Sequence, residues 1–295
     1  MSEFYRASNG AVFADRLELD AAYDVEGAVE DFGVYVDFFV NTSERARRDL
    51  RCELDISYGP TRAETLDIFP GEPGGPVVIF IHGGYWRTLT SKEFSLVAPG
   101  LVSRGATVVI PNYALLPSVT IDEIVRQMRA AVAWVHDHIA EYGGDPKRLL
   151  VSGHSAGGHL TAMLLDTDWE AEYGMAPDCI TAGCAISGLY DLRPLAFTSM
   201  QQDFRFTGEE ILRNSPQLGL PRSAPPLLIT YGVDQPSEFA RQSEDFYAAW
   251  RGAGLEAELW AREGLNHFDE LEAFGEPGSE LVERLMALLE QGGHS

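Results

Sequence analysis

The stretch Leu149-Leu150-Val151-Ser152-Gly153-His154-Ser155-Ala156-Gly157-Gly158 is the part of this chain that decides its fold. It opens with a continuous apolar run, typical of a strand buried on both faces, and it continues into helical apolar spacing from Gly157 to Leu165. Between the two lies a G-x-S-x-G sequence, which in this strand–turn–helix context predicts a nucleophile elbow. A serine on so tight a turn has a strained backbone, and side chains two residues away would collide, which explains both flanking glycines. We therefore predict that Ser155 is a nucleophile.

The chain from residue 51 onward alternates short strands with helices, and this alternation predicts a mostly parallel sheet flanked by helices. The first two strands of this region alternate like half-exposed strands. The remaining strands are continuous apolar runs bounded by Gly or Pro, and each helix carries apolar residues three and four positions apart. The predicted strands are Cys52–Tyr58, Thr65–Phe69, Val77–Ile81, Ala106–Ile110, Leu149–Ser152, Leu227–Thr230 and the strand-like run 257–260, and the predicted helices are Ile121–Tyr142, Gly157–Leu165, Phe239–Ala253 and Ser279–Gln291.

Two segments fall outside this alternation. Residues 1–50 form an N-terminal extension, in which Val34, Tyr35, Phe38 and Phe39 are spaced to share one face of an amphipathic helix that packs on the core. Residues 193–225 mix aromatic and polar side chains and interrupt the strand–helix pattern. We interpret them as a small cap inserted into a domain that covers residues 51–295.

Composition limits the function classes. The 295 residues contain 22 basic and 45 acidic side chains, a net charge of −23, which opposes binding to a nucleic acid or an anionic membrane. The apolar runs are far shorter than the roughly 20 residues of a membrane span, and the N-terminus resembles no secretory signal, so we expect a cytoplasmic protein. Its three cysteines lack metal-site spacing and fit reduced, buried thiols. The sequence leaves open whether the chain forms a homo-oligomer.

The sequence His82-Gly83-Gly84-Tyr85-Trp86 follows the predicted strand Val77–Ile81. Paired glycines after this strand allow backbone N–H groups to turn inward, and together with the amide that follows the nucleophile they predict an oxyanion hole. Its donors are Gly83, Gly84 and Ala156. We interpret His82 as a residue that fixes the loop through the backbone, whereas Tyr85, Trp86 and His154 are assigned to the substrate pocket, with packing of the loop as the alternative for Trp86.

An acid and a base should follow the serine in that order. Asp234 comes after the buried strand Leu227–Thr230, at the edge where ligands of open α/β sheets bind, so it is the preferred acid. His267 follows the next strand-like run and is the preferred base. Asp191 and Glu238 are the alternative acids.

These three motifs resemble those of the α/β-hydrolase superfamily, and His82-Gly83-Gly84-Tyr85-Trp86 resembles the HGGxW signature of kynurenine formamidases (arylformamidases) and related bacterial carboxylesterases. The resemblance runs from about residue 54 to the C-terminal helix. It implies an α/β-hydrolase fold and metal-independent hydrolysis by a triad of Ser155, Asp234 and His267, without any cofactor. The implied substrate is a small acyl amide or ester.

Three functions remain open at this stage. The first is a formamidase, and the second is a short-chain carboxylesterase. The third, more distant alternative is a catalytically inactive binding module on the same fold, although Ser155 and His267 are both present.

Overall fold

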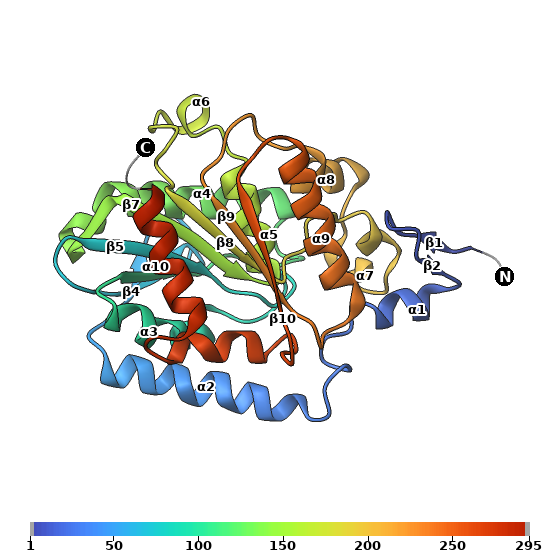
Figure 1. Cartoon of the computed structure of the whole chain (residues 1–295), viewed down its shortest axis with the longest axis horizontal. Coiled ribbons are helices and arrows are strands. Elements are labelled where there is room, and N and C mark those ends of the chain that lie inside the picture. The colour runs from blue at the N-terminus through green and yellow to red at the C-terminus, as the bar shows by residue number, and fades with distance from the viewer. Residues whose placement is uncertain (1–2, 293–295) are drawn as a thin grey trace.

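The computed structural model describes residues 3–292, so the ends of the two predicted regions, residues 1–2 and 293–295, lie outside the described part of the chain. An eight-stranded sheet runs through the molecule in the order β10-β9-β8-β7-β5-β6-β4-β3 (Figure 1). Its strands are β3 (Glu53–Ser57), β4 (Thr65–Phe69), β5 (Gly75–Ile81), β6 (Thr107–Pro111), β7 (Gly144–His154), β8 (Ala182–Ile186), β9 (Leu227–Gly232) and β10 (Ala257–Arg262).

The six strands from β5 to β10 are parallel, whereas β4 pairs antiparallel with β6 and β3 antiparallel with β4. In the centre, Ile79 of β5 lies beside Val151 of β7 and Val109 of β6, and all three side chains are completely buried. This burial on both faces is why these strands are continuous apolar runs. Since β5, β7, β8 and β9 share one direction, the loops after them meet at one edge of the sheet.

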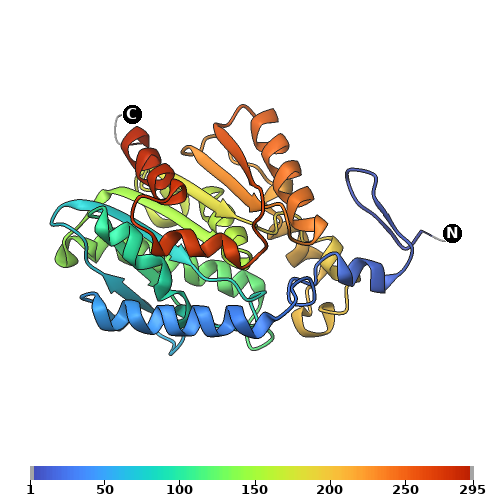
Figure 2. The ribbon, with the colours of Figure 1, turned by 60° about the horizontal axis from the view of Figure 1, so that its bottom comes forward.

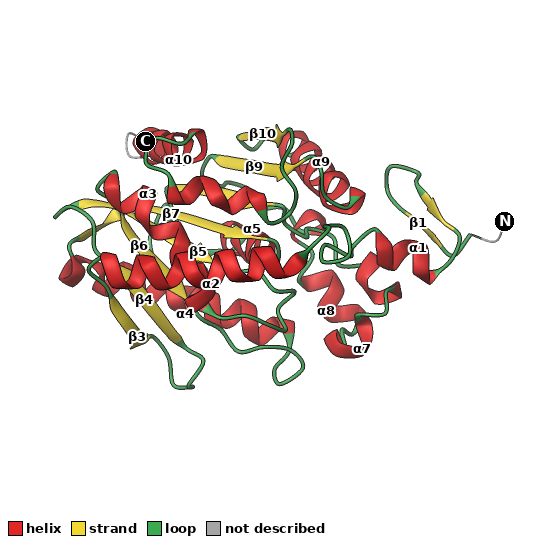
Figure 3. Ribbon diagram, turned by 90° about the horizontal axis from the view of Figure 1, so that it is seen from below, coloured by secondary structure: helices red, strands yellow, loops and turns green. Residues whose placement is uncertain are grey.

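Helices cover both faces of the sheet. In Figure 1, α10 crosses in front of the sheet, α4 and α5 lie behind it, and α2 runs along the lower side next to α3. Figure 3 shows the sheet from below, with α2 across the front. The α-helices are α1 (Arg16–Ala21), α2 (Phe32–Asp49), α3 (Ala98–Ser103), α4 (Ile121–His138), α5 (Ala156–Leu165), α6 (Trp169–Tyr173), α7 (Gln201–Phe204), α8 (Gly208–Arg213), α9 (Ser237–Gly252) and α10 (Glu280–Gly292), and the 3₁₀ helices are η1 (Ser91–Val97), η2 (Ile139–Tyr142), η3 (Pro194–Phe197), η4 (Pro216–Leu218) and η5 (Asp269–Gly275).

The predicted strands and long helices are present, with ends that differ by a few residues. The prediction missed β8, whose small residues give a weaker apolar signal than its neighbours. It was also wrong about β4, which is buried rather than half-exposed because other segments cover its faces: Asp67 accepts a hydrogen bond from Ser91 of η1 at 3.1 Å. In α2, Tyr35, Phe38 and Phe39 pack against the core as expected, but Val34 is 60% exposed because it lies about 140° around the helix from Phe39, on which the buried face centres.

The N-terminal segment and residues 193–225 gather at one end of the molecule. Figure 2 shows a hairpin of β1 (Tyr5–Arg6) and β2 (Val12–Phe13) that projects beyond the sheet beside α1. The backbone N–H of Ser199 donates to Asp20 Oδ1 at 2.7 Å, which joins the two segments. The predicted boundaries at 50, 193 and 225 stay predictions.

Two other expectations concern the membrane and the thiols. Within residues 3–292, no helix combines the length and the apolar character needed to cross a membrane. The three cysteines are free, and Cys179 and Cys184 are buried, whereas Cys52 is only partly buried. Burial raises the pKa of both buried thiols to about 12, so neither is a nucleophile at neutral pH.

Candidate active site

Ser155 lies at the turn between β7 and α5, with φ of 56° and ψ of −118°. This is the strained backbone that the G-x-S-x-G motif predicts. A Cβ atom on Gly153 would overlap the carbonyl oxygen of Gly157, and one on Gly157 would overlap the carbonyl oxygen of Ile81. The two glycines are therefore required by close backbone approach, and they let the turn present Ser155 at the carboxyl edge of the sheet.

The loop after β5 packs directly against Ser155. A Cβ atom on Gly83 would lie 3.2 Å from Ser155 Cβ, and Gly84 has φ of 100°. Within residues 3–292, the N–H groups of Gly83 and Gly84 donate to no backbone carbonyl, and the N–H of Ala156 is at the first position of α5, where no intrahelical acceptor exists. In the described part of the chain, Gly83 and Ala156 thus carry unpaired amides beside the serine, and Gly84 carries another in the same loop; their role as oxyanion donors stays a prediction.

His82 holds this loop in place. Its Nδ1 is 2.8 Å from the carbonyl oxygen of Gly83, and its ring stacks on Tyr113 with 4.1 Å between centroids. Burial lowers the pKa of His82 to about 4. A neutral, backbone-bonded imidazole fixes the loop, which is the role that we predicted for it.

His267 reaches the same place from the loop after β10. Its ring packs on that of His154, the residue before Ser155, with 4.4 Å between centroids. Ser155 is 3% exposed and His267 is 2% exposed, so both are buried at this edge of the sheet. The predicted base therefore packs on the residue next in sequence to the predicted nucleophile.

The predicted acid is not the residue that holds His267. Nδ1 of His267 is 2.7 Å from Oε1 of Gln235, while Asp234 is exposed. The N–H groups of Val233 and Asp234 donate to carbonyl oxygens of Arg262 and Leu265, which extends the strand beyond β9. The residue that contacts the imidazole therefore comes one position later than predicted. The prediction that Asp234 is the hydrogen-bond partner of His267 is corrected: that partner is the amide of Gln235.

The carboxylates of the two alternative acids, Asp191 and Glu238, each pair with an arginine. Asp191 is buried and forms a bidentate pair with Arg193, at 2.9 Å for both contacts. Glu238 is buried in a pair with Arg241 and accepts a hydrogen bond from Tyr23 at 2.7 Å. Neither carboxylate faces His267.

A buried carboxylate that the sequence analysis missed lies behind the histidine pair. Glu270 is completely buried, and its Oε2 lies 3.4 Å from Nε2 of His154, an electrostatic contact rather than a well-formed hydrogen bond. His154 is therefore part of this buried group, and its assignment to the substrate pocket stays a prediction. Burial, and next the electrostatic effect of the neighbouring His154 ring, hold the pKa of His267 well below its usual value. Only the spacing of Glu270 three residues after His267 could have drawn attention to it.

Among residues 3–292, His154, His267 and Glu270 form the group that could hold a cation, since their nitrogen and oxygen atoms lie within 4.8 Å of one another. However, Nδ1 of His267 bonds to Gln235, and Oε1 of Glu270 accepts a hydrogen bond from Ser187 at 2.8 Å. These bonds place the side chains in a hydrogen-bond network. The absence of a metal stays a prediction.

Aromatic side chains close the site. Trp86 is completely buried and packs edge-on against His159, Phe204 and Phe206, so it supports the loop rather than lining a pocket. Tyr85 donates from its hydroxyl to the carbonyl oxygen of Tyr23 at 2.6 Å, which ties the loop to the N-terminal segment.

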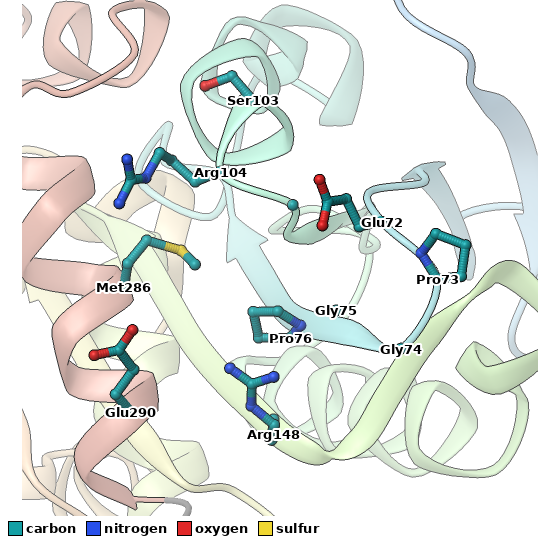
Figure 4. Close-up of a pocket in the computed structure, with 11 residues that line it drawn as sticks. Glu72, Pro73, Gly74, Gly75, Pro76, Ser103, Arg104, Arg148, Met286 and Glu290 are labelled. Atoms are coloured by element: carbon teal, nitrogen blue, oxygen red, sulfur yellow. The ribbon is translucent and has the colours of Figure 1, made fainter.

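Two cavities lie at the opposite edge of the sheet. The one in Figure 4, of about 470 Å³, is lined by Glu72, Arg104 and Arg148 and lies where β5 begins. A second, of about 690 Å³, lies before β8 and β9 and is lined by Thr181 and Pro226. Both are at the amino ends of the strands, so neither contains the nucleophile.

Comparison with known proteins decides the family. Residues 66–249 match the family model BD-FAE. The chain belongs to the BD-FAE family. This BD-FAE protein is an α/β hydrolase, an enzyme that hydrolyses acyl groups, as the resemblance of its motifs implies.

Similar proteins include formamidases and esterases. A kynurenine formamidase of Danio rerio is 33% identical over 255 residues, which cover 84% of this chain and 85% of the relative. Esterase LipQ of Mycobacterium tuberculosis is 30% identical over 68% of this chain and 53% of its own length. The structure of a provisionally assigned thioesterase from Silicibacter sp. TM1040 is 31% identical, with a TM-score of 0.80 over 91% of this chain and 99% of that one.

Proposed function

We propose that this protein is a serine hydrolase that removes a small acyl group, above all formyl, from an aryl amide, as a kynurenine formamidase does. The observation that carries the proposal is the elbow at Ser155, with His267 packed on the adjacent His154. The similarity to kynurenine formamidases over 84% of the chain supports the formyl amide as substrate. N-formylkynurenine is the natural first compound to test.

The proposed reaction is acyl transfer in two steps. Nε2 of His267 takes the proton of Ser155 Oγ as that oxygen bonds to the substrate carbonyl carbon, while the amides of Gly83, Gly84 and Ala156 bind the oxyanion. His267 then gives the proton to the amine nitrogen as the C–N bond breaks. Water, deprotonated by His267, attacks the acyl-serine ester, and formate leaves as the proton returns to Ser155.

The surroundings of Ser155 favour a small acyl group. Its side chain is only 3% exposed, and Tyr85, fixed by Tyr23, packs beside the oxyanion loop with Phe204. A formyl or acetyl group adds little volume, whereas a long acyl chain would have to displace these packed rings. A flat aromatic leaving group suits an aromatic surround.

The test is a side-by-side assay of N-formylkynurenine and p-nitrophenyl acetate, butyrate and laurate. We expect cleavage of the formamide at least comparable with that of acetate or butyrate, and a steep fall by laurate. Activity should also survive EDTA, because the proposed steps use no metal.

The second candidate is a short-chain carboxylesterase, which the 30% identity to Esterase LipQ favours. Strong ester cleavage with negligible formamide cleavage would select it. Efficient cleavage of the laurate ester would reject a site for small acyl groups, for the formamidase and for the esterase alike. Loss of activity on chelation, restored by zinc, would reject the metal-free mechanism.

A further inference from the structure

Gln235 fixes the orientation of His267 through its amide. Its Nε2 donates to Ser187 Oγ at 2.9 Å and to the carbonyl oxygen of Gly232 at 2.8 Å. Since both contacts are acceptors for the NH₂ group, Oε1 is the end that faces the imidazole. Nδ1 of His267 must therefore donate, which leaves Nε2 unprotonated and able to take a proton from Ser155.

At this position a carboxylate would both orient the imidazole and stabilise its positive charge, whereas a neutral amide only orients it. It satisfies the Nδ1–H and sets the tautomer, but it has no charge to stabilise the imidazolium that forms when Ser155 loses its proton. His267 is 2% exposed, so water cannot supply that stabilisation. A negative charge nearby is needed.

Glu270 provides that charge through a chain of hydrogen bonds. Its Oε1 accepts from Ser187 Oγ at 2.8 Å and from the N–H of Gly232. Ser187 Oγ in turn accepts from Gln235, so the chain runs from the carboxylate through Ser187 and Gln235 to Nδ1 of His267. Ser187 has φ of 46°, an uncommon backbone conformation that places its hydroxyl between the two side chains.

The same carboxylate also approaches the imidazole through His154. Its second oxygen, Oε2, lies 3.4 Å from Nε2 of His154, whose ring packs on His267. The other titratable groups facing this cluster are Arg262 of β10, which donates to the backbone oxygen of Glu270, and two buried groups that are neutral at pH 7, Cys184 and Tyr190. Glu270 is thus the carboxylate that this hydrogen-bond network links to His267.

We propose that Glu270 is the carboxylate that stabilises the His267 imidazolium, acting through Ser187 and Gln235 and across His154 in place of an acid bonded directly to the histidine. Glu270 is a positioning and electrostatic residue, since it touches neither substrate nor reacting atoms. This inference rests on the proposed function, because it concerns the proton that Ser155 gives to His267.

The test is Glu270→Gln in the full chain, which keeps the size of the side chain and removes its charge. We expect kcat to fall by roughly 10²-fold, within the range that general acid–base catalysis contributes, with KM nearly unchanged. The acid limb of kcat/KM should move to lower pH, because loss of the negative charge favours the neutral imidazole. Ser187→Ala interrupts the chain of hydrogen bonds. It should lower kcat and move the acid limb of kcat/KM to lower pH, each by less than Glu270→Gln does.

Glu64→Gln is the matched control. Glu64 is equally buried but pairs with Arg126 far from the site, so its loss should alter stability and leave the pH profile unchanged. Unchanged kcat and acid limb in Glu270→Gln and Ser187→Ala would overturn the inference, and Ser187→Ala decides alone if Glu270→Gln does not fold.

The two proposals fail differently. If a fluorophosphonate does not label Ser155 in the wild-type protein, the proposed function fails. If labelling and hydrolysis are normal but the variants keep the wild-type pH profile, only the role of Glu270 fails.

Discussion

Nδ1 of His267 lies 2.7 Å from Oε1 of Gln235, and the neighbouring Asp234 is exposed to solvent. The residue that orients the base is therefore an amide, not an acid. The group that orients the histidine is therefore different from the group that we propose as its counter-charge, Glu270. Substitutions at Gln235 and at Glu270 can test the two roles separately.

The first prediction ranks the two neighbours. Gln235→Ala should lower kcat by roughly 10²-fold or more, because His267 loses the bond that fixes its ring and tautomer, whereas Asp234→Asn should change kcat less than about 2-fold. Gln235→Glu should restore part of the activity, since a carboxylate also accepts from Nδ1. Steady-state kinetics with circular dichroism of each variant provides the measurement, and the opposite ranking would return the role to Asp234.

The second prediction concerns the nucleophile. Ser155→Ala should remove nearly all turnover and keep the fold, because the mechanism assigns the covalent step to that hydroxyl. Mass spectrometry after fluorophosphonate treatment should place a single adduct on the peptide that contains Ser155. An active alanine variant, or an adduct on another residue, would refute the assignment.

The third prediction is the pH dependence of activity. Burial, and next the electrostatic effect of the His154 ring, hold the pKa of His267 well below its usual value of 6.5, and the base works only when it is neutral. Activity should therefore stay high as the pH falls through 6.5 and decline only at lower pH. Measurement of kcat/KM from pH 4.5 to 8.5, with the folded fraction checked at each pH, tests this, and an acid limb at 6.5 or above would contradict it.

The fourth prediction is a loss of stability in acid. Burial lowers the pKa of both His82 and His159 to about 4, against 6.5 in the unfolded chain. Above pH 6.5 neither state binds the proton, whereas between 6.5 and 4 only the unfolded chain does. As the pH is lowered from 6.5 to 4, the free energy of unfolding should therefore fall by roughly 1.4 kcal/mol per pH unit for each histidine.

Urea unfolding at pH 7.5, 6 and 5 measures this slope. His159→Gln should reduce the slope by the share of one histidine, because glutamine keeps a donor for the carbonyl oxygen of Asn214 but does not titrate. Met163→Leu, one turn further along α5, is the control, since it changes core packing without changing a proton-binding group. Equal slopes in wild type and His159→Gln would show that His159 does not contribute.

Local patterns predicted much of the fold and part of the site. The G-x-S-x-G turn predicts Ser155 at a strained position, because Cβ atoms on Gly153 and Gly157 would overlap backbone oxygens of the turn itself and of Ile81. The loop after Ile81 likewise places Gly83 against the serine, and the apolar run Val77–Ile81 specifies a strand buried on both faces. The apolar run acts through neighbours in sequence, whereas Gly157 and Gly83 are also constrained by contacts between the loop after β5 and the turn at Ser155.

Contacts between distant segments decided the rest. Whether Asp234 or Gln235 meets His267 depends on how far the strand beyond β9 stays paired with the chain after β10, a one-residue difference that no local signal carries. Ser187, Gln235 and Glu270 come from three loops, and their hydrogen bonds exist only once β8, β9 and β10 stand side by side. The sequence by itself determined most of the strands and the turn at Ser155, because turn sterics and apolar periodicity are local, whereas the catalytic pairing of Ser155 with His267 stays a prediction. The tertiary structure alone decided which groups orient that histidine and supply its counter-charge, because hydrogen bonds and burial depend on where the whole chain places each side chain.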